Sequence, residues 1–108
     1  MKKVIWLIPL FVSTFAFAGT QEGKVTQLEV RATDGLHYFY LSGAATGRPS
    51  CAQNQSYWMI ADESSVAGQS QYALLLAAYM SGETVTVSGT NACNRWNDGE
   101  DVKTIILK

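Results

Sequence analysis

Residues 72–89 read YALLLAAYMSGETVTVSG and contain the change of periodicity that decides the fold. Within 72–81, apolar side chains recur at i, i+3, i+4 and i+7, which is typical of an α-helix. Gly82 is suited to the left-handed conformation that ends a helix. Residues 83–89 then alternate apolar and polar side chains with the period of a strand. The sequence therefore predicts a helix that is followed directly by a strand.

The predicted helix is apolar on nearly every side, because alanine, leucine and methionine fill the positions between its periodic residues. A surface helix keeps a polar face, so we expect this one to be buried on most sides, by a sheet and, in an assembly, by another subunit. Asp62, Ser64 and Ser65 are the candidate N-cap residues, and the pattern does not choose between them.

Three strands are predicted before the helix, and a further one closes the chain. Residues 25–32 alternate apolar and polar side chains, and the Thr-Asp-Gly turn at 33–35 leads to the aromatic run 38–41, as in a β-hairpin. Residues 57–60 form a third short apolar run, and 102–107 is a β-branched segment. The predicted order is strand, strand, strand, helix, strand, strand, which describes a mainly β fold with one helix.

That order in a small chain matches the five-stranded OB-fold barrel, in which the helix lies between the third and fourth strands. A small α+β sheet covered by one helix has the same order, so the order alone does not separate the two. The chain has 108 residues, 47% apolar and 16% charged, which is enough for one domain and excludes a disordered chain.

The start of the chain has the features of an export signal. Two lysines precede the apolar run 4–12, and residues 16–18 (Ala-Phe-Ala) form a small-x-small cleavage motif. We predict a secretory signal peptide at 1–18, cleaved after Ala18, and a single mature domain at 19–108 that is secreted or periplasmic. The apolar run is shorter than a membrane span and contains a proline; a retained anchor is the competing interpretation.

Cleavage would change the charge of the protein. Six basic side chains remain against nine acidic ones, a net charge of −3. An acidic exported domain is not attracted to phosphate backbones or to anionic lipid, so we expect no nucleic-acid partner and no membrane span after processing. Its ligand should be neutral, locally complementary or another protein.

Cys51 and Cys93 are the only cysteines, so only one intramolecular pairing exists. In an oxidising compartment they should form a structural disulfide, which closes a loop of about 43 residues and removes roughly 4 kcal/mol of unfolded-state entropy. A reactive or metal-binding pair would need a nearby histidine or a Cys-x-x-Cys spacing, and the sequence has neither.

No pattern in the sequence points to catalysis, a metal or a cofactor. His37, the only histidine, lies beside the predicted hairpin turn, where a packing role is the simplest, and no Gly-x-Ser-x-Gly elbow frames a nucleophile. Asp98, Glu100 and Asp101 lack the framework of a calcium loop, which favours a solvated acidic turn. We therefore expect a non-enzymatic protein that uses neither metal nor cofactor.

Aromatic side chains are the most suggestive feature, because sugar rings and protein interfaces both use flat apolar faces with polar edges. Trp96 stands in a polar loop before the last strand, between Arg95 and Asn97, and these three are the candidate ligand-binding residues. The competing interpretation is that most of the rings face the core, because one parity of each strand points inward. The full aromatic set considered is Tyr38, Tyr40, Tyr57, Trp58 and Trp96.

Three stretches carry a family resemblance: 38–43 (YFYLSG), 50–52 (SCA) with Trp58 shortly after, and 71–85 (QYALLLAAYMSGETV). They resemble the B subunits of pertussis-like AB5 toxins, in particular those of subtilase cytotoxin and typhoid toxin, over about residues 25–89. The resemblance implies an OB-fold subunit that assembles into a pentamer and binds sialylated glycans.

The sequence also departs from those B subunits. The cysteine that matches Cys51 pairs there with one at the position of Tyr40, whereas here the partner is Cys93. The serine that contacts sialic acid corresponds, in an ungapped match, to Gln21. The fold is therefore carried over more safely than the ligand, and no glycan-binding residue is transferred.

The sequence thus predicts an exported binding or assembly subunit, which recognises a glycan and forms a homo-pentamer if the resemblance holds. The alternative is a stand-alone periplasmic module of OB-like fold that binds or inhibits a protein. A third class, a small hydrolase, would depend on His37.

Overall fold

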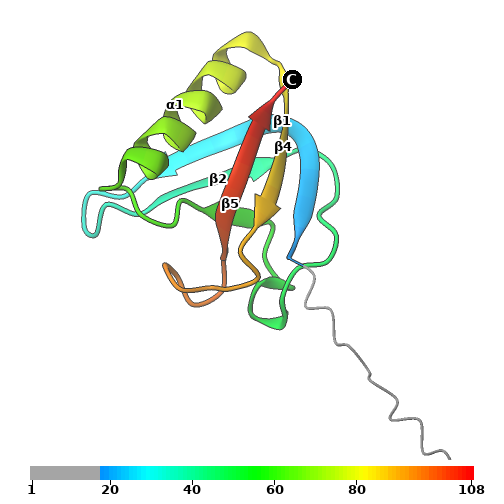
Figure 1. The fold of residues 1–108 in the computed structure, drawn as a ribbon, viewed down its shortest axis with the longest axis vertical. Coiled ribbons are helices and arrows are strands. Elements are labelled where there is room, and N and C mark those ends of the chain that lie inside the picture. Colours follow the sequence, from blue (N-terminus) through cyan, green and yellow to red (C-terminus); the bar gives the residue numbers. More distant parts are fainter. Residues whose placement is uncertain (1–17) are drawn as a thin grey trace, which may run out of the picture.

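A computed structural model describes residues 18–108 and shows five strands that close into a barrel, with one α-helix against its side (Figure 1). The predicted element order is confirmed. The predicted signal peptide, Ala18 apart, lies outside the described residues. The elements in chain order are β1 (Thr20–Val30), β2 (His37–Leu41), the 3₁₀ turn η1 (Ser50–Ala52), β3 (Tyr57–Met59), α1 (Val66–Ser81), β4 (Thr84–Gly89) and β5 (Glu100–Leu107).

The strands are neighbours in the order β1-β2-β3-β5-β4, and β4 pairs again with β1 to close the barrel. Every pair is antiparallel except β3 with β5, which run parallel. A small closed barrel of five strands is the OB-fold-like architecture that the sequence predicts. Closure of the sheet excludes the open α+β alternative.

Strand β1 is longer than its sequence pattern suggests and serves two neighbours. Residues 20–24 pair with β4, and 25–30 pair with β2, with an irregular register between Val25 and Gln27. An extra residue of this kind bends a strand, which lets β1 pass from one part of the barrel to the next. The first half escapes the apolar pattern because its inward side chain is the polar Gln21.

Gln21 is buried because it is hydrogen-bonded at both ends. Its side-chain oxygen accepts from Trp58 Nε1 at 2.8 Å, and its amide nitrogen donates to the carbonyls of Leu41 and Gly43 at 3.2 and 2.8 Å. Trp58 is therefore a core residue and not a contact residue. The core cluster consists of Val25, Phe39, Leu41, Trp58, Ile60, Leu75, Ala78, Val85, Val87, Val102 and Ile105.

Helix α1 begins and ends with ordinary capping residues. The hydroxyl of Ser65, the N-cap, accepts from the backbone N–H of Gly68 at 2.9 Å. Gly82 ends the helix with φ +71°, and its N–H donates to the carbonyl of Ala78 at 2.9 Å. The predicted glycine stop is confirmed, and Ser65 is selected from the three N-cap candidates.

The expectation that α1 is buried on most sides is wrong for the single chain. The helix packs across β1, β4 and β5, and only Gly68, Leu75 and Ala78 are buried. A helix lying on a barrel contacts it along one narrow stripe, so the rest of its surface stays open even when that surface is apolar. The large exposed apolar residues of α1 are Val66, Leu74, Leu76, Tyr79 and Met80.

The predicted disulfide is confirmed. Cys51 in η1 is bonded to Cys93 in the loop between β4 and β5, across a sequence separation of 42 residues, with the two Cα atoms 6.3 Å apart. The bond ties the segment before β3 to the loop that carries Trp96.

Candidate functional site

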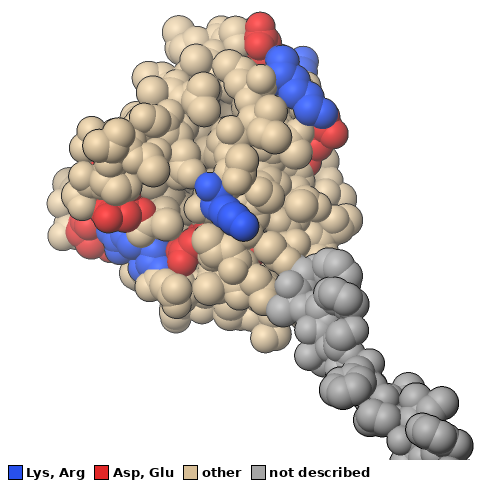
Figure 2. Space-filling view, in the orientation of Figure 1, with Lys and Arg blue, Asp and Glu red and all other residues tan. Residues whose placement is uncertain are grey.

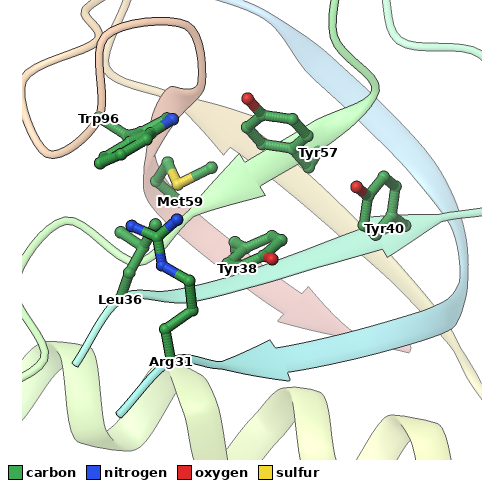
Figure 3. A pocket seen from close by; sticks show the side chains of 7 residues that line it. All are labelled: Arg31, Leu36, Tyr38, Tyr40, Tyr57, Met59 and Trp96. Atoms are coloured by element: carbon green, nitrogen blue, oxygen red, sulfur yellow. The ribbon is translucent and has the colours of Figure 1, made fainter. Parts of the chain in front are cut away.

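A pocket of about 130 Å³ lies on the outer face of β2 and β3, below the β4–β5 loop (Figure 3). Alternate residues of a strand share a face, so the odd-numbered core residue Phe39 points inward and its neighbours Tyr38 and Tyr40 point outward. We call this site the tyrosine pocket. Its lining consists of Arg31, Leu36, Tyr38, Tyr40, Tyr57, Met59 and Trp96.

Three tyrosines form the floor of the pocket through edge contacts. Tyr40 of β2 stands opposite Tyr57 of β3 in the ladder, and their ring centroids are 5.8 Å apart. Tyr38 lies 5.7 Å from Tyr57 and 6.4 Å from Tyr40. All three pairs are edge-to-face, the arrangement that the charge distribution of aromatic rings prefers. The rings brace one another and offer a preformed apolar surface.

Tyr57 is fixed further by a carboxylate at the rim. Its phenol donates to Asp98 Oδ1, and Gln55 Nε2 donates to Asp98 Oδ2 at 3.1 Å. Burial, together with the hydrogen bond to Asp98, raises the pKa of Tyr57 to about 12. The phenol is therefore neutral at physiological pH. Because its proton is donated to Asp98, the hydroxyl oxygen can only accept a hydrogen bond from a ligand.

Arg31 and Trp96 close the opposite side of the pocket. The guanidinium carbon of Arg31 lies 4.5 Å from the centroid of the Trp96 ring, within the range of a cation–π contact. Arg31 also donates from Nε to Asp34 Oδ1 at 3.2 Å, and this pairing lowers the pKa of Asp34. Asp34 thus offsets much of the positive charge that Arg31 brings to the pocket.

The three predicted ligand-binding residues have different positions. Trp96 lines the pocket. Arg95 instead braces the loop: its Nε donates to both Glu63 oxygens at 3.0 and 3.1 Å, and Nη2 donates to the carbonyl of Asp34 at 2.9 Å. Asn97 is exposed and is not part of the lining. The structure therefore brings only Trp96 to this site.

Glu63 connects three segments of the chain. Besides Arg95, it receives the backbone N–H of His37 at 3.1 Å, so it joins the residues before α1 to β2 and to the β4–β5 loop. Burial raises the pKa of Glu63, but the hydrogen bonds from Arg95 and from the backbone outweigh it, and the pKa lies below its ordinary value. The carboxylate is held in its charged form by these donors.

His37 has the packing role that its position beside the turn suggests. Its Nδ1 lies 2.6 Å from the carbonyl oxygen of Gly35, and its ring meets Tyr72 of α1 edge-on at 5.0 Å. It therefore links the β1–β2 turn to the helix.

The interpretation of Asp98, Glu100 and Asp101 as a solvated acidic turn is wrong. Glu100 and Asp101 are buried, and Asp101 accepts the backbone N–H groups of Asn94 and Arg95 at 3.0 and 3.1 Å. Because buried backbone donors need acceptors, these carboxylates organise the loop from inside. Among residues 18–108, no group of three or more histidine, cysteine or acidic side chains is placed to hold a metal ion.

Sequence reasoning missed three of the lining residues, Arg31, Leu36 and Met59. The alternation of side chains along β3 could have indicated Met59, because residues 57 and 59 share the face opposite to the core residue Trp58. No comparable signal exists for Arg31 and Leu36, which reach the pocket only because the β1–β2 turn folds beside the β4–β5 loop.

A second hollow, of about 260 Å³, shares no lining residue with the tyrosine pocket. Gln21, Arg48, Gln53 and Gln55 are among its lining residues, and no aromatic side chain lines it. Both ends of the Gln21 amide are already bonded within the barrel, whereas Arg48 keeps Nε and Nη2 without a hydrogen-bond partner among the described residues. Because no aromatic ring lines this hollow, it lacks the stacking surface that the tyrosine pocket has.

No family model, curated protein or solved structure matches this chain. Within the described part of the chain, no helix is long and apolar enough to cross a membrane.

Proposed function

We propose that this chain is an exported, non-enzymatic binding subunit that recognises a glycan in the tyrosine pocket. One observation carries the proposal. Aromatic side chains from β2, β3 and the β4–β5 loop converge on one face of the barrel, beside the β1–β2 turn. In OB-folds this is the surface that binds oligonucleotides or oligosaccharides.

Charge favours a sugar over a nucleic acid at this surface. The predicted mature chain has a net charge of −3. Asp98 stands at the pocket rim, Glu29 is paired with Tyr38 across β1 and β2, and Asp34 offsets the charge of Arg31. Figure 2, which views the barrel from the side of β4 and β5, shows most basic groups lying beside acidic ones and no extended basic stripe on that face. A polyanion would meet little attraction here, whereas a neutral ligand would meet no barrier.

The chemistry of the lining suits a sugar ring. The faces of Tyr40 and Trp96 can stack against the apolar C–H side of a pyranose, and phenol and guanidinium groups can bond its hydroxyls. The tyrosines already brace one another, so little conformational entropy is lost on binding.

The resemblance to AB5 toxin B subunits supports a glycan ligand, with a different site. Tyr40, which stands at the position of the second cysteine of those subunits, lines the pocket here. Gln21 corresponds to the serine that contacts sialic acid in those subunits, but here both ends of its side-chain amide form hydrogen bonds inside the barrel. The disulfide and the predicted signal peptide support export.

A second candidate function is favoured by the exposed apolar face of α1. That face would join copies of the chain in an assembly, such as the pentamer that the resemblance implies. Alternatively, it would contact a protein partner in the periplasm. Light scattering on residues 19–108 tests for the assembly, and a pentamer is the size that the resemblance implies.

The glycan proposal is tested by applying residues 19–108 to a glycan array and measuring the dissociation constant of the best binder. We expect Trp96→Ala and Tyr40→Ala each to weaken binding about tenfold or more, because each removes a stacking face. Tyr79→Ala removes a more exposed tyrosine, on α1 and outside the pocket, and is the control, expected to leave affinity within about twofold.

Two results would overturn the proposal. One is the absence of binding to every glycan on the array. The other is binding that survives Trp96→Ala but is lost in Gln53→Ala, which would move the site to the second hollow.

A further inference from the structure

Glu100, the first residue of β5, is a fully buried carboxylate with one unused oxygen. Its Oε2 accepts the backbone N–H of Gly19 at 3.0 Å and that of Asn91 at 3.0 Å. Its Oε1 is buried and has no hydrogen-bond partner among the described residues. A buried carboxylate with an unpaired oxygen is costly unless a further donor or a positive charge reaches it.

No basic side chain forms an ion pair with Glu100 within the described residues. Arg48 is a basic group near it: burial lowers the pKa of Arg48, and the charge of Glu100 partly opposes that effect. The Arg48 guanidinium lies over the Trp58 ring at 4.3 Å and donates Nη1 to the carbonyl of Tyr57 at 3.0 Å. Its Nε and Nη2 are buried without a hydrogen-bond partner among the described residues, but neither forms an ion pair with Glu100, so Oε1 stays unsatisfied.

Gly19 is held firmly beside this carboxylate. Its carbonyl accepts the N–H of Gly89 at 2.9 Å, and the next residue, Thr20, exchanges two backbone hydrogen bonds of 2.9 Å with Thr46. A Cβ atom at either Gly19 or Gly89 would collide with the Glu100 carboxylate. The two glycines thus allow the Gly19 nitrogen and the carboxylate to meet at close range.

We propose that Glu100 is the receptor for the α-amino group that signal-peptide cleavage creates on Gly19. The inference rests on the predicted cleavage after Ala18 and is independent of the ligand. Hydrolysis of the Ala18–Gly19 bond consumes one water. The C–N bond breaks, the carbonyl carbon of Ala18 gains the hydroxyl of the water and the Gly19 nitrogen gains its hydrogen. The new carboxyl group then gives up its proton and the amine takes one up, which leaves a carboxylate on Ala18 and an ammonium group on Gly19.

Cleavage changes the number of hydrogen bonds that the Gly19 nitrogen can donate, and its charge, while its position stays the same. As an amide it has one hydrogen, which goes to Oε2. As an ammonium it has three hydrogens and a positive charge, so it can bond Oε2 and the unused Oε1 together. Processing therefore completes a buried ion pair between the chain start and β5, and the mature barrel is more stable than the uncleaved one.

The test compares two chains that differ only at the terminal nitrogen, which is a charged ammonium in one and a neutral acetyl amide in the other. Residues 19–50 are made as a peptide with either a free or an acetylated Gly19 and are ligated to residues 51–108 at Cys51. We expect acetylation to lower the midpoint of thermal unfolding by about 10 °C, since it removes one partner of a buried pair and keeps the amide hydrogen bond.

A second comparison shows whether Glu100 is the receptor. In Glu100→Gln, acetylation should shift the midpoint by less than about 2 °C. In Glu22→Gln, which alters an exposed carboxylate on the same first strand, the shift should remain that of the unaltered chain. If Glu100→Gln fails to fold, the proposal is tested by the shift of the thermal midpoint on acetylation in the unaltered chain and in the Glu22→Gln chain.

Three results would overturn the proposal. They are an equal midpoint for the free and acetylated chains, an equal shift in the Glu100→Gln chain, and a residue other than Gly19 at the start of the exported protein.

Discussion

The tyrosine pocket and the outward face of α1 both place apolar side chains at the surface, but they are built differently. In the pocket, three rings contact one another edge-on, and Tyr57 donates to a carboxylate that a second side chain holds. On the helix, Val66 and Met80 are 82% and 77% exposed. One surface is concave and braced, and the other is convex and unsupported.

This difference bears on what each surface can recognise. A concave site with preformed rings and a few fixed polar groups can select a small ligand by shape and hydrogen bonding. A convex apolar face has area but few directional groups, so it suits association with another apolar surface. The pocket is therefore the candidate for ligand specificity, and α1 is the candidate for assembly.

The largest effect is expected from removal of the disulfide, which supports the pocket and not the helix. The Cys51→Ser/Cys93→Ser protein should lose about 4 kcal/mol in its free energy of unfolding, because the unfolded chain regains the entropy of the loop between two cysteines that are 42 positions apart. Urea denaturation of both proteins measures the loss.

Ser50→Ala, next to the bond, is the control and should change stability by no more than about 0.5 kcal/mol. If the double variant kept full stability, the disulfide would be incidental to the fold. Ligand affinity should fall with stability, because the freed loop carries Trp96.

Two adjacent leucines separate the inner and outer faces of α1. Leu75 is fully buried against the barrel, whereas Leu76 is 45% exposed. Leu75→Ala should lower the free energy of unfolding by about 3 kcal/mol, because it opens a cavity in the core. Leu76→Ala should change it by no more than about 0.5 kcal/mol in the monomer.

Chemical denaturation at low protein concentration measures both leucine variants. An equal loss of unfolding free energy in the two variants would mean that the outer face of α1 is covered in the monomer, which would contradict the exposure of Leu76. A cost for Leu76→Ala that grows with protein concentration would instead show that α1 joins copies of the chain.

The smallest effect is expected from Glu63, which links the helix start to the loop of the pocket. Its pKa is lowered from an ordinary value of 4.5, so its pairing stabilises the fold fully above that pH and is lost as the pH falls through the lowered pKa. Glu63→Gln should therefore cost about 1 kcal/mol at pH 7 and almost nothing in strong acid.

The measurement for Glu63 is the free energy of unfolding from pH 2 to pH 7 for both proteins. Glu83→Gln, an exposed carboxylate after the same helix, is the control at pH 7. A difference between Glu63→Gln and the parent protein that grows toward acid would contradict the assigned sign.

Much of the fold follows from local signals. The Asp-Gly turn, the glycine that ends α1 and the alternation of the strands each depend on residues within a few positions of one another, so the sequence predicts them directly. The disulfide also follows, because two cysteines allow one pairing. For the site, the sequence indicated Trp96 and the three tyrosines, which line the pocket, but it also indicated Trp58, Arg95 and Asn97, which do not.

Other properties were decided by contacts between distant segments. Arg31 and Leu36 join Trp96 only through the closure of the barrel, and Arg95, adjacent to Trp96, is drawn instead to Glu63. No local pattern could show that Glu100 turns inward to Gly19, 81 positions away.

The sequence by itself determined the order of elements, the glycine that ends the helix and the pairing of the cysteines, since these depend on local backbone preference and composition. Only the tertiary structure decided which aromatic rings form a pocket and which carboxylates are buried. The physical reason is that a closed barrel places strands side by side that are distant in the sequence. The burial of a residue then depends on neighbours that no short stretch of sequence contains.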